Sequence, residues 1–467
     1  MFRTFALLAV ALTAVLIPSY GADTATLSLV GSSNKICQLT GDTDWASNKP
    51  TAAQTWSNFG LQAVDLGFPV DSGVDRLYFL FGDAWPIDHP RGSAPAVPPD
   101  DALGWTTRTS APDKASCLDL RLATSMPKKF AHPTVRPAIK QGLFNVPSGG
   151  VFLDKTLYAF FWVDHCVKPG MLQPDASAPL SLPASSADCV ETPTNNSIGN
   201  SVLARATPDD PVAFQQTIPA KPIPFLGPVP VHMPSGFVYV SAATPAPSPM
   251  QIYDPKRPEI PVMGVARYRA SVPYLALAPR STFGDPTTWS YFAGRSRGNP
   301  VWLTYKEWES GRNANGAWVP PPDAQIYQPV AQDEYCIGEH SLTWNAALHS
   351  WLLLYGCGVR GIEARVAPAP WGPWSAPTTL LSVAHDPGVF CTLLMGPLGC
   401  PGQLRHNDWP LKNGKVVVGG FYAPFVLNRF TQEELTSGAK LATIYWLVST
   451  WNPYQVVVMQ STLKLTD

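Results

Sequence analysis

The sequence has few charged residues and no basic cluster. Only 14% of its 467 residues are charged, and 33 Lys and Arg residues nearly balance 34 Asp and Glu residues, for a formal net charge of -1. A chain that binds nucleic acid needs a basic surface to face the phosphates. The composition therefore argues against a nucleic-acid partner.

Beyond its N-terminus, the chain also lacks an apolar run of the ~20 residues that a membrane-spanning helix needs. At the N-terminus, Arg3 precedes a shorter apolar run at residues 5–17, and Pro18 and small residues follow. This is the order of a secretory signal rather than of a membrane anchor. We predict a signal peptide over residues 1–21, one domain over residues 22–467, and a secreted, extracellular protein without a membrane partner.

The cysteines lack the paired close spacing of a zinc site. Three neighbouring acid–His pairs have no matched second pair at ligand spacing, which favours loop salt bridges: Asp88-His89, Asp164-His165 and His385-Asp386. We predict no metal and no cofactor. The eight cysteines instead suit disulfides in an exported protein. The expected pairs, which sequence alone does not fix, are Cys37–Cys117, Cys166–Cys189, Cys336–Cys357 and Cys391–Cys400.

Long amphipathic helical patterns are scarce, and 50 Pro and 35 Gly residues favour turns. The best short helix candidate is residues 431–435, where Thr431 is a possible cap and Glu434 completes a capping box. Short runs rich in aromatic and β-branched residues recur between turn residues, which indicates strands. They lie at residues 76–81, 156–163, 237–240, 351–355 and 415–418.

An internal repeat organises these strands. Residues 145–150 and 232–237 are near copies, and Ala-Arg strands recur at residues 202–205, 264–267 and 362–365. About five units begin near Asp65, Pro147, Pro234, Gly338 and Arg405. Such units arranged radially form a propeller. We predict an all-β fold, a five-bladed β-propeller with long proline-rich loops at 92–115, 168–195 and 242–262; an ordinary β-sandwich is the alternative.

Two aspartates stand out in the first unit. Asp65 interrupts an apolar stretch, and Asp83 follows an apolar strand and Gly82, so one hairpin is expected to hold both carboxylates. Cleavage of a glycosidic bond typically needs two carboxyl groups, a general acid and a nucleophile or base. The alternative is that Asp83 caps a turn and Asp65 accepts hydrogen bonds from backbone amides.

Other polar and aromatic residues near the starts of the units are candidates for binding a sugar. Glu339 begins a predicted inner strand, and a polar cluster lies next to an aromatic residue at 405–409. Both also fit an ordinary strand end or surface loop. The predicted binding residues are Trp85, Ser148, Ser235, Glu339, His340, His406, Asn407 and Asp408.

Several short segments resemble a family of secreted proteins catalogued as a domain of unknown function, DUF4185. In chain order they are residues 64–67, 80–83, 338–341, 364–375 and 449–459. The family is grouped with glycoside hydrolases as endo-D-arabinanases. The resemblance implies a five-bladed propeller with a central carbohydrate cleft, catalytic aspartates at Asp65 and Asp83, and cleavage of the α-linked D-arabinofuranose chains of mycobacterial arabinogalactan and lipoarabinomannan.

The chain departs from the family pattern beside both aspartates. Ala63 stands where a small polar residue is expected, and Ala84 stands where a threonine is expected. These differences put the exact furanoside in question. The sequence thus predicts an extracellular glycoside hydrolase acting on a polysaccharide, with Asp65 and Asp83 as its acid and its nucleophile or base. The alternative is a propeller that binds carbohydrate without cleaving it.

Overall fold

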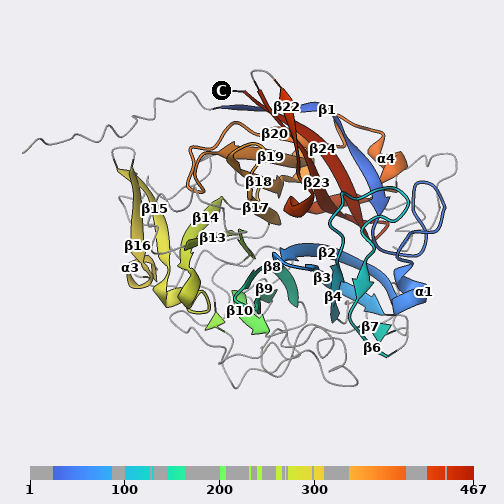
Figure 1. The fold of residues 1–467 in the computed structure, drawn as a ribbon, viewed down its shortest axis with the longest axis horizontal. Coiled ribbons are helices and arrows are strands. Elements are labelled where there is room, and N and C mark those ends of the chain that lie inside the picture. Colours follow the sequence, from blue (N-terminus) through green and yellow to red (C-terminus); the bar gives the residue numbers. More distant parts are fainter. Residues whose placement is uncertain are drawn as a thin grey trace, which may run out of the picture.

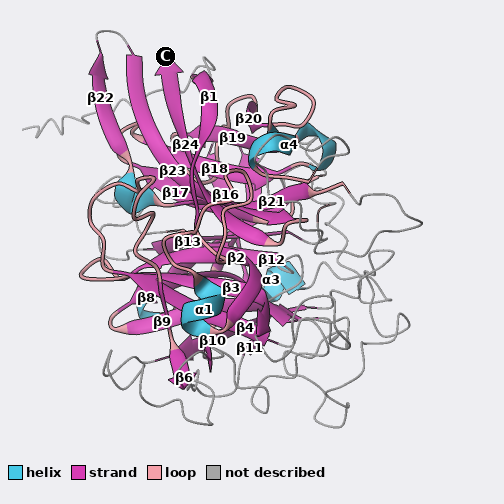
Figure 2. Cartoon of the chain, turned by 90° about the vertical axis from the view of Figure 1, so that its right-hand side faces the viewer, coloured by secondary structure: helices cyan, strands magenta, loops and turns pink. Residues whose placement is uncertain are grey.

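The computed structural model describes a chain built from antiparallel β-strands. The described residues are 25–86, 100–126, 129–130, 145–163, 200–206, 231–232, 239–243, 259–265, 269, 272–296, 299–309, 336–395, 418–436 and 439–466. The α-helices among them are α1 (Thr55–Phe59), α3 (Tyr305–Glu309) and α4 (Val389–Thr392), none longer than five residues. Figure 2 shows these short helices between the strands. The prediction of an all-β fold is confirmed.

Within the described residues the strands form five sheets of four or five strands and one two-stranded pair. The first sheet contains β2 (Leu61–Asp71), β3 (Leu77–Pro86), β4 (Asp100–Thr106) and β5 (Arg121–Leu122). The second contains β8 (Asn145–Leu153), β9 (Thr156–Val163), β10 (Asn200–Ala206) and β11 (Val231–His232). The small pair is β6 (Thr124–Met126) with β7 (Lys129–Phe130).

The other three sheets follow in chain order. The third contains β12 (Tyr239–Ala242), β13 (Glu259–Val265), β14 (Pro273–Pro279), β15 (Ser290–Ser296) and β16 (Asn299–Thr304). The fourth contains β17 (His340–Asn345), β18 (Ser350–Gly356), β19 (Ile362–Ala367) and β20 (Thr378–Leu381). The fifth contains β21 (Gly420–Val426), β22 (Gln432–Thr436), β23 (Ala439–Trp451), β24 (Gln455–Thr466) and the N-terminal strand β1 (Thr26–Gln38).

The first strands of the five sheets contact one another in a closed cycle. Strand β2 contacts β8, β8 contacts β12, β12 contacts β17, β17 contacts β21, and β21 contacts β2 again. Figure 1 shows the sheets following one another around the molecule in sequence order, from blue through green, yellow and orange to red. Strands far apart in sequence therefore meet at the centre.

Apolar side chains fill the spaces between neighbouring sheets. One cluster joins the first sheet to the second and fifth, and others join the second to the third, the third to the fourth, and the fourth to the fifth. Phe81, Phe160 and Trp446 are completely buried in three of these clusters. Burying one such side chain contributes about 1.5–3 kcal/mol. Strands buried along nearly their whole length, such as β17 and β19, thus drive the packing of one sheet against the next.

Buried serine hydroxyls join neighbouring sheets near the centre. Ser148 on β8 donates to the carbonyl of Val240 on β12, 2.9 Å away. Ser341 on β17 accepts from the amide of Val426 and donates to the carbonyl of Pro424, each at 3.1 Å, and both partners belong to β21. The amide of Leu66 on β2 donates to Ser449 on β23 at 2.8 Å. These bonds satisfy backbone groups where one sheet meets another.

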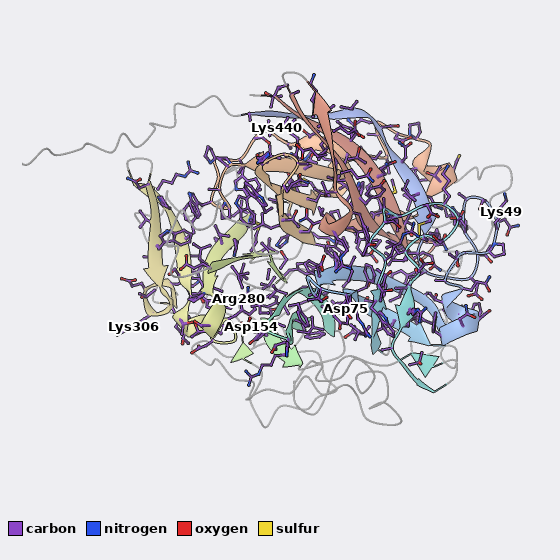
Figure 3. All side chains as sticks on the ribbon, in the orientation of Figure 1. Lys49, Asp75, Asp154, Arg280, Lys306 and Lys440 are labelled. Carbon is purple, nitrogen blue, oxygen red and sulfur yellow. A yellow bond between two sulfur atoms is a disulfide. The ribbon has the colours of Figure 1, made fainter. Side chains whose placement is uncertain are left out.

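Two further contacts link segments that are far apart in the sequence. Strand β1 pairs antiparallel with β24, with Thr26 opposite Thr466. On the outer surface, Asp154 in the turn after β8 forms an ion pair with Arg280 at 2.9 Å, and Figure 3 shows the two side by side.

Two predicted disulfides are confirmed. Cys37 bonds Cys117, and Cys336 bonds Cys357. Cys391 is also disulfide-bonded, and its predicted partner Cys400, like the predicted pair Cys166–Cys189, lies outside the described residues.

The predicted helix at residues 431–435 is wrong. Residues Gln432–Thr436 form strand β22, paired along its whole length with β23. The carboxylate of Glu434 accepts from the hydroxyl of Thr443 at 2.8 Å instead of completing a capping box. Ladder bonds to a neighbouring strand outweigh a local capping signal in so short a segment. Two predicted loops also contain strands, since β4 lies within 92–115 and β13 begins within 242–262.

No described helix is long and apolar enough to cross a membrane. The predicted signal peptide lies outside the described residues.

Candidate active site

The two predicted aspartates lie together in the first hairpin. Asp65 is on β2, opposite Gly82 on β3, and Asp83 is the next residue of β3. Side chains of successive strand residues point to opposite faces, so a regular hairpin would turn Asp83 away from Asp65. Asp83 instead has φ of 47°, in a break of register between Phe81 and Ala84. A left-handed residue at a bulge re-aims its side chain.

One tyrosine hydroxyl lies between the two carboxylates. The hydroxyl of Tyr454, in the turn between β23 and β24, is 2.7 Å from Oδ2 of Asp65 and 3.1 Å from Oδ2 of Asp83. A second tyrosine, Tyr422 on β21, donates to the same Oδ2 of Asp65 at 2.7 Å. Residues from β2, β3, β21 and the last turn therefore converge on one carboxylate pair.

The surroundings favour a proton on Asp65. Burial raises the pKa of this carboxyl well above its ordinary value, and the charge of Asp83 raises it further. The hydroxyls of Tyr422 and Tyr454 oppose the increase, while the more distant charge of Glu339 adds to it. Like charges held close together cannot both ionise freely. The pair is thus arranged to hold one proton that a solvated pair would lose.

Tyr454 remains a neutral donor. Burial and the neighbouring carboxylates Asp65 and Asp83 raise the pKa of its hydroxyl well above the ordinary value of 10. Its ring packs with Ala63 and Trp85 in a small buried cluster, and Tyr422 and Trp451 border it. This packing fixes the ring and so holds the hydroxyl between the carboxylates.

Glu339 lies at the same end of the ring, immediately before β17. Its carboxylate, 2% exposed, accepts two bonds from Arg269, from Nε at 3.0 Å and from Nη2 at 2.5 Å. The Arg269 guanidinium is also 4.7 Å from the centre of the Tyr422 ring. The Arg269 side chain keeps 43% of its surface exposed. It therefore reaches from the buried carboxylates to the solvent.

Three other predicted binding residues are buried. Trp85 packs under Tyr454. His340 is fully buried, with Nδ1 2.8 Å from the Gly338 carbonyl and Nε2 3.2 Å from the Met263 carbonyl, and burial lowers its pKa. Ser148 is one of the serines that join sheets.

The remaining predicted residues, Ser235, His406, Asn407 and Asp408, lie outside the described residues. Among the described residues no group of three or more His, Cys, Asp or Glu side chains is arranged to hold a metal ion. Sequence reasoning missed Tyr422, Tyr454 and Arg269. The first two are 357 and 389 residues from Asp65 in the chain.

The comparisons with known proteins give a partial family match. Residues 250–460, somewhat under half of the chain, match the model of a domain of unknown function, DUF4185. No curated protein matches the chain.

The chain also shows a distant likeness to two solved structures. One is a protein from Bacteroides ovatus named as a "putative hydrolase", at 10% identity and a TM-score of 0.47, covering 87% of each chain. The other is the Trypanosoma rangeli sialidase bound to 2,3-difluoro-KDN, at 8% identity and a TM-score of 0.32, covering 93% of this chain and 58% of that one. These likenesses are too distant to carry an argument about activity.

Proposed function

We propose that the protein is a secreted glycoside hydrolase built as a five-bladed β-propeller. The observation that carries the proposal is the carboxylate pair of the buried Asp65 and the half-buried Asp83, bridged by the hydroxyl of Tyr454. The closed cycle of inner strands supports the propeller. The two disulfides support an oxidising compartment, and hence cleavage of a signal peptide at residues 1–21.

Asp65 acts as the general acid. Its raised pKa keeps a proton available near neutral pH, and the proton passes to the glycosidic oxygen as the bond to the anomeric carbon breaks. Asp83 is more exposed than Asp65 and forms the new bond to the anomeric carbon. Water then attacks this glycosyl-enzyme, giving its proton back to Asp65 and releasing Asp83.

The spacing of the carboxylates supports retention of configuration. Since their Oδ2 atoms lie 2.7 and 3.1 Å from one hydroxyl oxygen, they are at most 5.8 Å apart, the sum of the two distances. Retaining enzymes hold their carboxyl groups ~5–5.5 Å apart, whereas inverting enzymes need ~6.5–9.5 Å to admit water.

The proposed substrate is an α-linked D-arabinan, cleaved within the chain. The support is the match of residues 250–460 to the DUF4185 model and the resemblance of the Asp65 and Asp83 segments to that family. Arg269, anchored by Glu339 and partly exposed, has donors to offer sugar hydroxyls. His406, Asn407 and Asp408 remain proposed as further sugar contacts.

The deciding experiment measures new reducing ends released from mycobacterial arabinogalactan. We expect release by the parent protein and a loss of at least about 1000-fold in Asp65→Asn and Asp83→Asn, since each removes an obligatory proton-transfer or bond-forming group. Asp75→Asn is the matched control, because Asp75 lies in the turn between β2 and β3 with 61% of its side chain exposed. Activity in either site variant equal to that of the control would refute the carboxylate assignment.

Azide assigns the two roles. Small anions replace the missing group in truncated retaining enzymes, so Asp83→Ala with azide should form a glycosyl azide of inverted configuration. Asp65→Ala should form one of retained configuration, because its nucleophile is still present. If Asp83→Ala gave the retained product and Asp65→Ala the inverted one, Asp83 would be the general acid and Asp65 the nucleophile. If no variant and no parent protein releases sugar but all bind arabinan, the protein is a carbohydrate-binding propeller instead.

A further inference from the structure

A pocket lies at the other end of the ring from Asp65 and Asp83. It has a volume of about 120 Å³ and is lined by residues of all five inner strands. Strand β2 contributes its last residues, Phe68 to Asp71, whereas Asp65 lies nearer its start. Likewise Val426 ends β21, while Tyr422 lies near its beginning. The pocket is therefore separate from the carboxylate site, along the same central axis.

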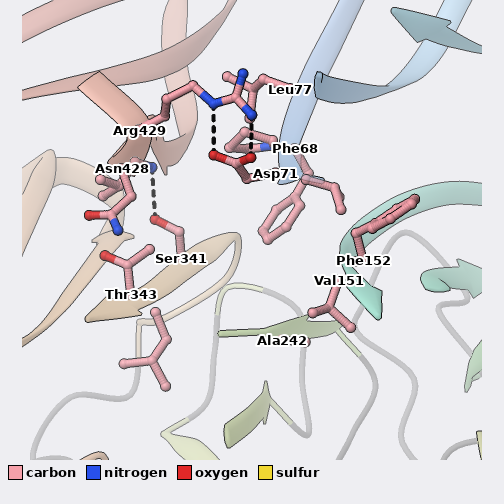
Figure 4. Close-up of a pocket in the computed structure, with 15 residues that line it drawn as sticks. Phe68, Asp71, Leu77, Val151, Phe152, Ala242, Ser341, Thr343, Asn428 and Arg429 are labelled. Atoms are coloured by element: carbon pink, nitrogen blue, oxygen red, sulfur yellow. Dashed lines mark hydrogen bonds and ion pairs between the residues drawn. The ribbon is translucent and has the colours of Figure 1, made fainter. Parts of the chain in front are cut away.

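The pocket has two unlike walls. Figure 4 shows Asn428, Ser341 and Thr343 on one side, with Phe68, Val151 and Phe152 across the space from them. An aromatic and aliphatic wall suits the apolar face of a small ring, and an amide and hydroxyls suit its polar edge.

Charge at the pocket is already balanced. Arg429 donates to Asp71 through both Nε, at 2.9 Å, and Nη2. Nη2 also donates to the Arg76 carbonyl at 3.0 Å. A guanidinium neutralised in this way has little attraction left for an anion. The lining therefore favours a neutral ligand over phosphate or a carboxylate.

Three polar side chains of the lining have unmet hydrogen bonds. Thr343 Oγ1, Asn428 Oδ1 and Arg429 Nη1 are covered from solvent and have no hydrogen-bond partner in the described structure. Thr343 as a whole is only 6% exposed. Covered polar atoms without partners are rare and costly in folded proteins. All three residues line the pocket, so hydroxyls of a bound molecule are suited to supply the missing partners.

We propose that this pocket binds one small neutral polyhydroxylated molecule, of the size of a single pentose ring. Its volume is far above the space that one water molecule needs. The ring of the ligand lies against Phe68 and Phe152, and its hydroxyls pair with Thr343 and Asn428. This site binds without cleaving, and it stands whether or not the protein hydrolyses arabinan.

Calorimetry with free D-arabinose tests the proposal, with inorganic phosphate as the anionic probe. We expect millimolar binding of D-arabinose and none of phosphate. Thr343→Val removes one hydroxyl and should weaken binding about tenfold. Ala242→Leu fills the pocket and should abolish binding, which covers the case in which Thr343→Val folds poorly. Thr466→Val, at the end of β24, is the matched control.

The position of the sugar separates the two sites. A crystal of the parent protein soaked in D-arabinose should show the ring between Phe152 and Thr343, and Asp83→Asn should leave this binding unchanged. Ordered water alone in the pocket, or binding that Asp83→Asn removes and Ala242→Leu does not, would overturn the proposal. Phosphate binding that Thr343→Val weakens would also overturn it, because the ligand class would then be anionic.

Discussion

A single hydroxyl shared by two carboxylates is the most informative feature at the scale of the residue. Tyr454→Phe removes this hydroxyl and keeps the ring packed against Trp85. A hydrogen bond to a charged group contributes about 1.5–3 kcal/mol, so kcat should fall about 10- to 100-fold. The hydroxyl lowers the pKa of Asp65, so its loss raises that pKa. The alkaline limb of the pH–rate profile should therefore move to higher pH.

Tyr445→Phe is the control for this prediction. Tyr445 is also buried, on β23, but its hydroxyl bonds Gln460 rather than a carboxylate. Equal pH profiles in the two variants would contradict the bridging role of Tyr454.

The raised pKa of Asp65 also predicts a dependence of stability on pH. A carboxyl whose pKa is higher in the folded state stabilises the fold below about pH 3.8, and this stability is lost as pH rises through the raised pKa. Asp65→Asn is neutral at every pH. Its melting temperature should match that of the parent near pH 4 and exceed it at pH 8. At pH 8 the free energy of unfolding should be larger in the variant by on the order of 1 kcal/mol.

Thermal melts at both pH values measure the difference, with Asp75→Asn as the reference. Equal melting temperatures of Asp65→Asn and the parent at pH 8 would show that Asp65 ionises in the fold without loss of stability.

The sequence revealed the site only where its signal is local. Asp65 and Asp83 were recognisable because each interrupts or ends an apolar strand of one hairpin. The left-handed backbone of Asp83 was not, because nothing in Gly82-Asp83-Ala84 marks a bulge. Tyr422 and Arg269 carry no signal of their own, and Tyr454 lies in the segment 449–459 that resembles the family, without anything there to assign it a role. Only closure of the ring brings them to the aspartates, so their role depends on the tertiary structure.

At the scale of the element, the serines that bond across neighbouring sheets explain a sequence repeat that had suggested sugar binding. Ser148 belongs to a repeated Pro-Ser-Gly segment, and the structure uses its hydroxyl between β8 and β12. Residues that recur from unit to unit can serve the contacts between units rather than the binding of a ligand. Strands β3, β9 and β18 were predictable from local aromatic and β-branched runs, whereas β22 was not, since its partner β23 follows it in the chain and decides its conformation.

Ser341→Ala tests these serine bonds between sheets. The change leaves the Val426 amide and the Pro424 carbonyl without their buried partner, at a cost of about 1–3 kcal/mol. Urea denaturation should show a lower midpoint for this variant. Ser28→Ala, which removes a long 3.4 Å bond on the exposed face of β1, should leave the midpoint unchanged. Equal midpoints would mean that these bonds add nothing to stability.

At the scale of the whole molecule, two disulfides close loops of very different length. Cys37–Cys117 spans 80 residues, and Cys336–Cys357 spans 21. In the chain-entropy model these loops contribute about 4.5 and about 3.3 kcal/mol respectively. Replacing both cysteines of the longer loop by serine should therefore lower the melting temperature more than the same change in the shorter loop. The reverse order, measured by calorimetry, would mean that local strain or packing outweighs loop length.

The pairing of β1 with β24 has a consequence for the protein as it is being made. The strand that leaves the ribosome near the beginning finds its partner only when residues 455–466 have been translated. Until then β1 has no partner strand, and the fifth sheet lacks both β24 and β1. A product truncated before β24 therefore leaves β1 unpaired. Its exposed strand edge makes it prone to aggregation and proteolysis. Completion of the fifth sheet therefore depends on both β1 and β24.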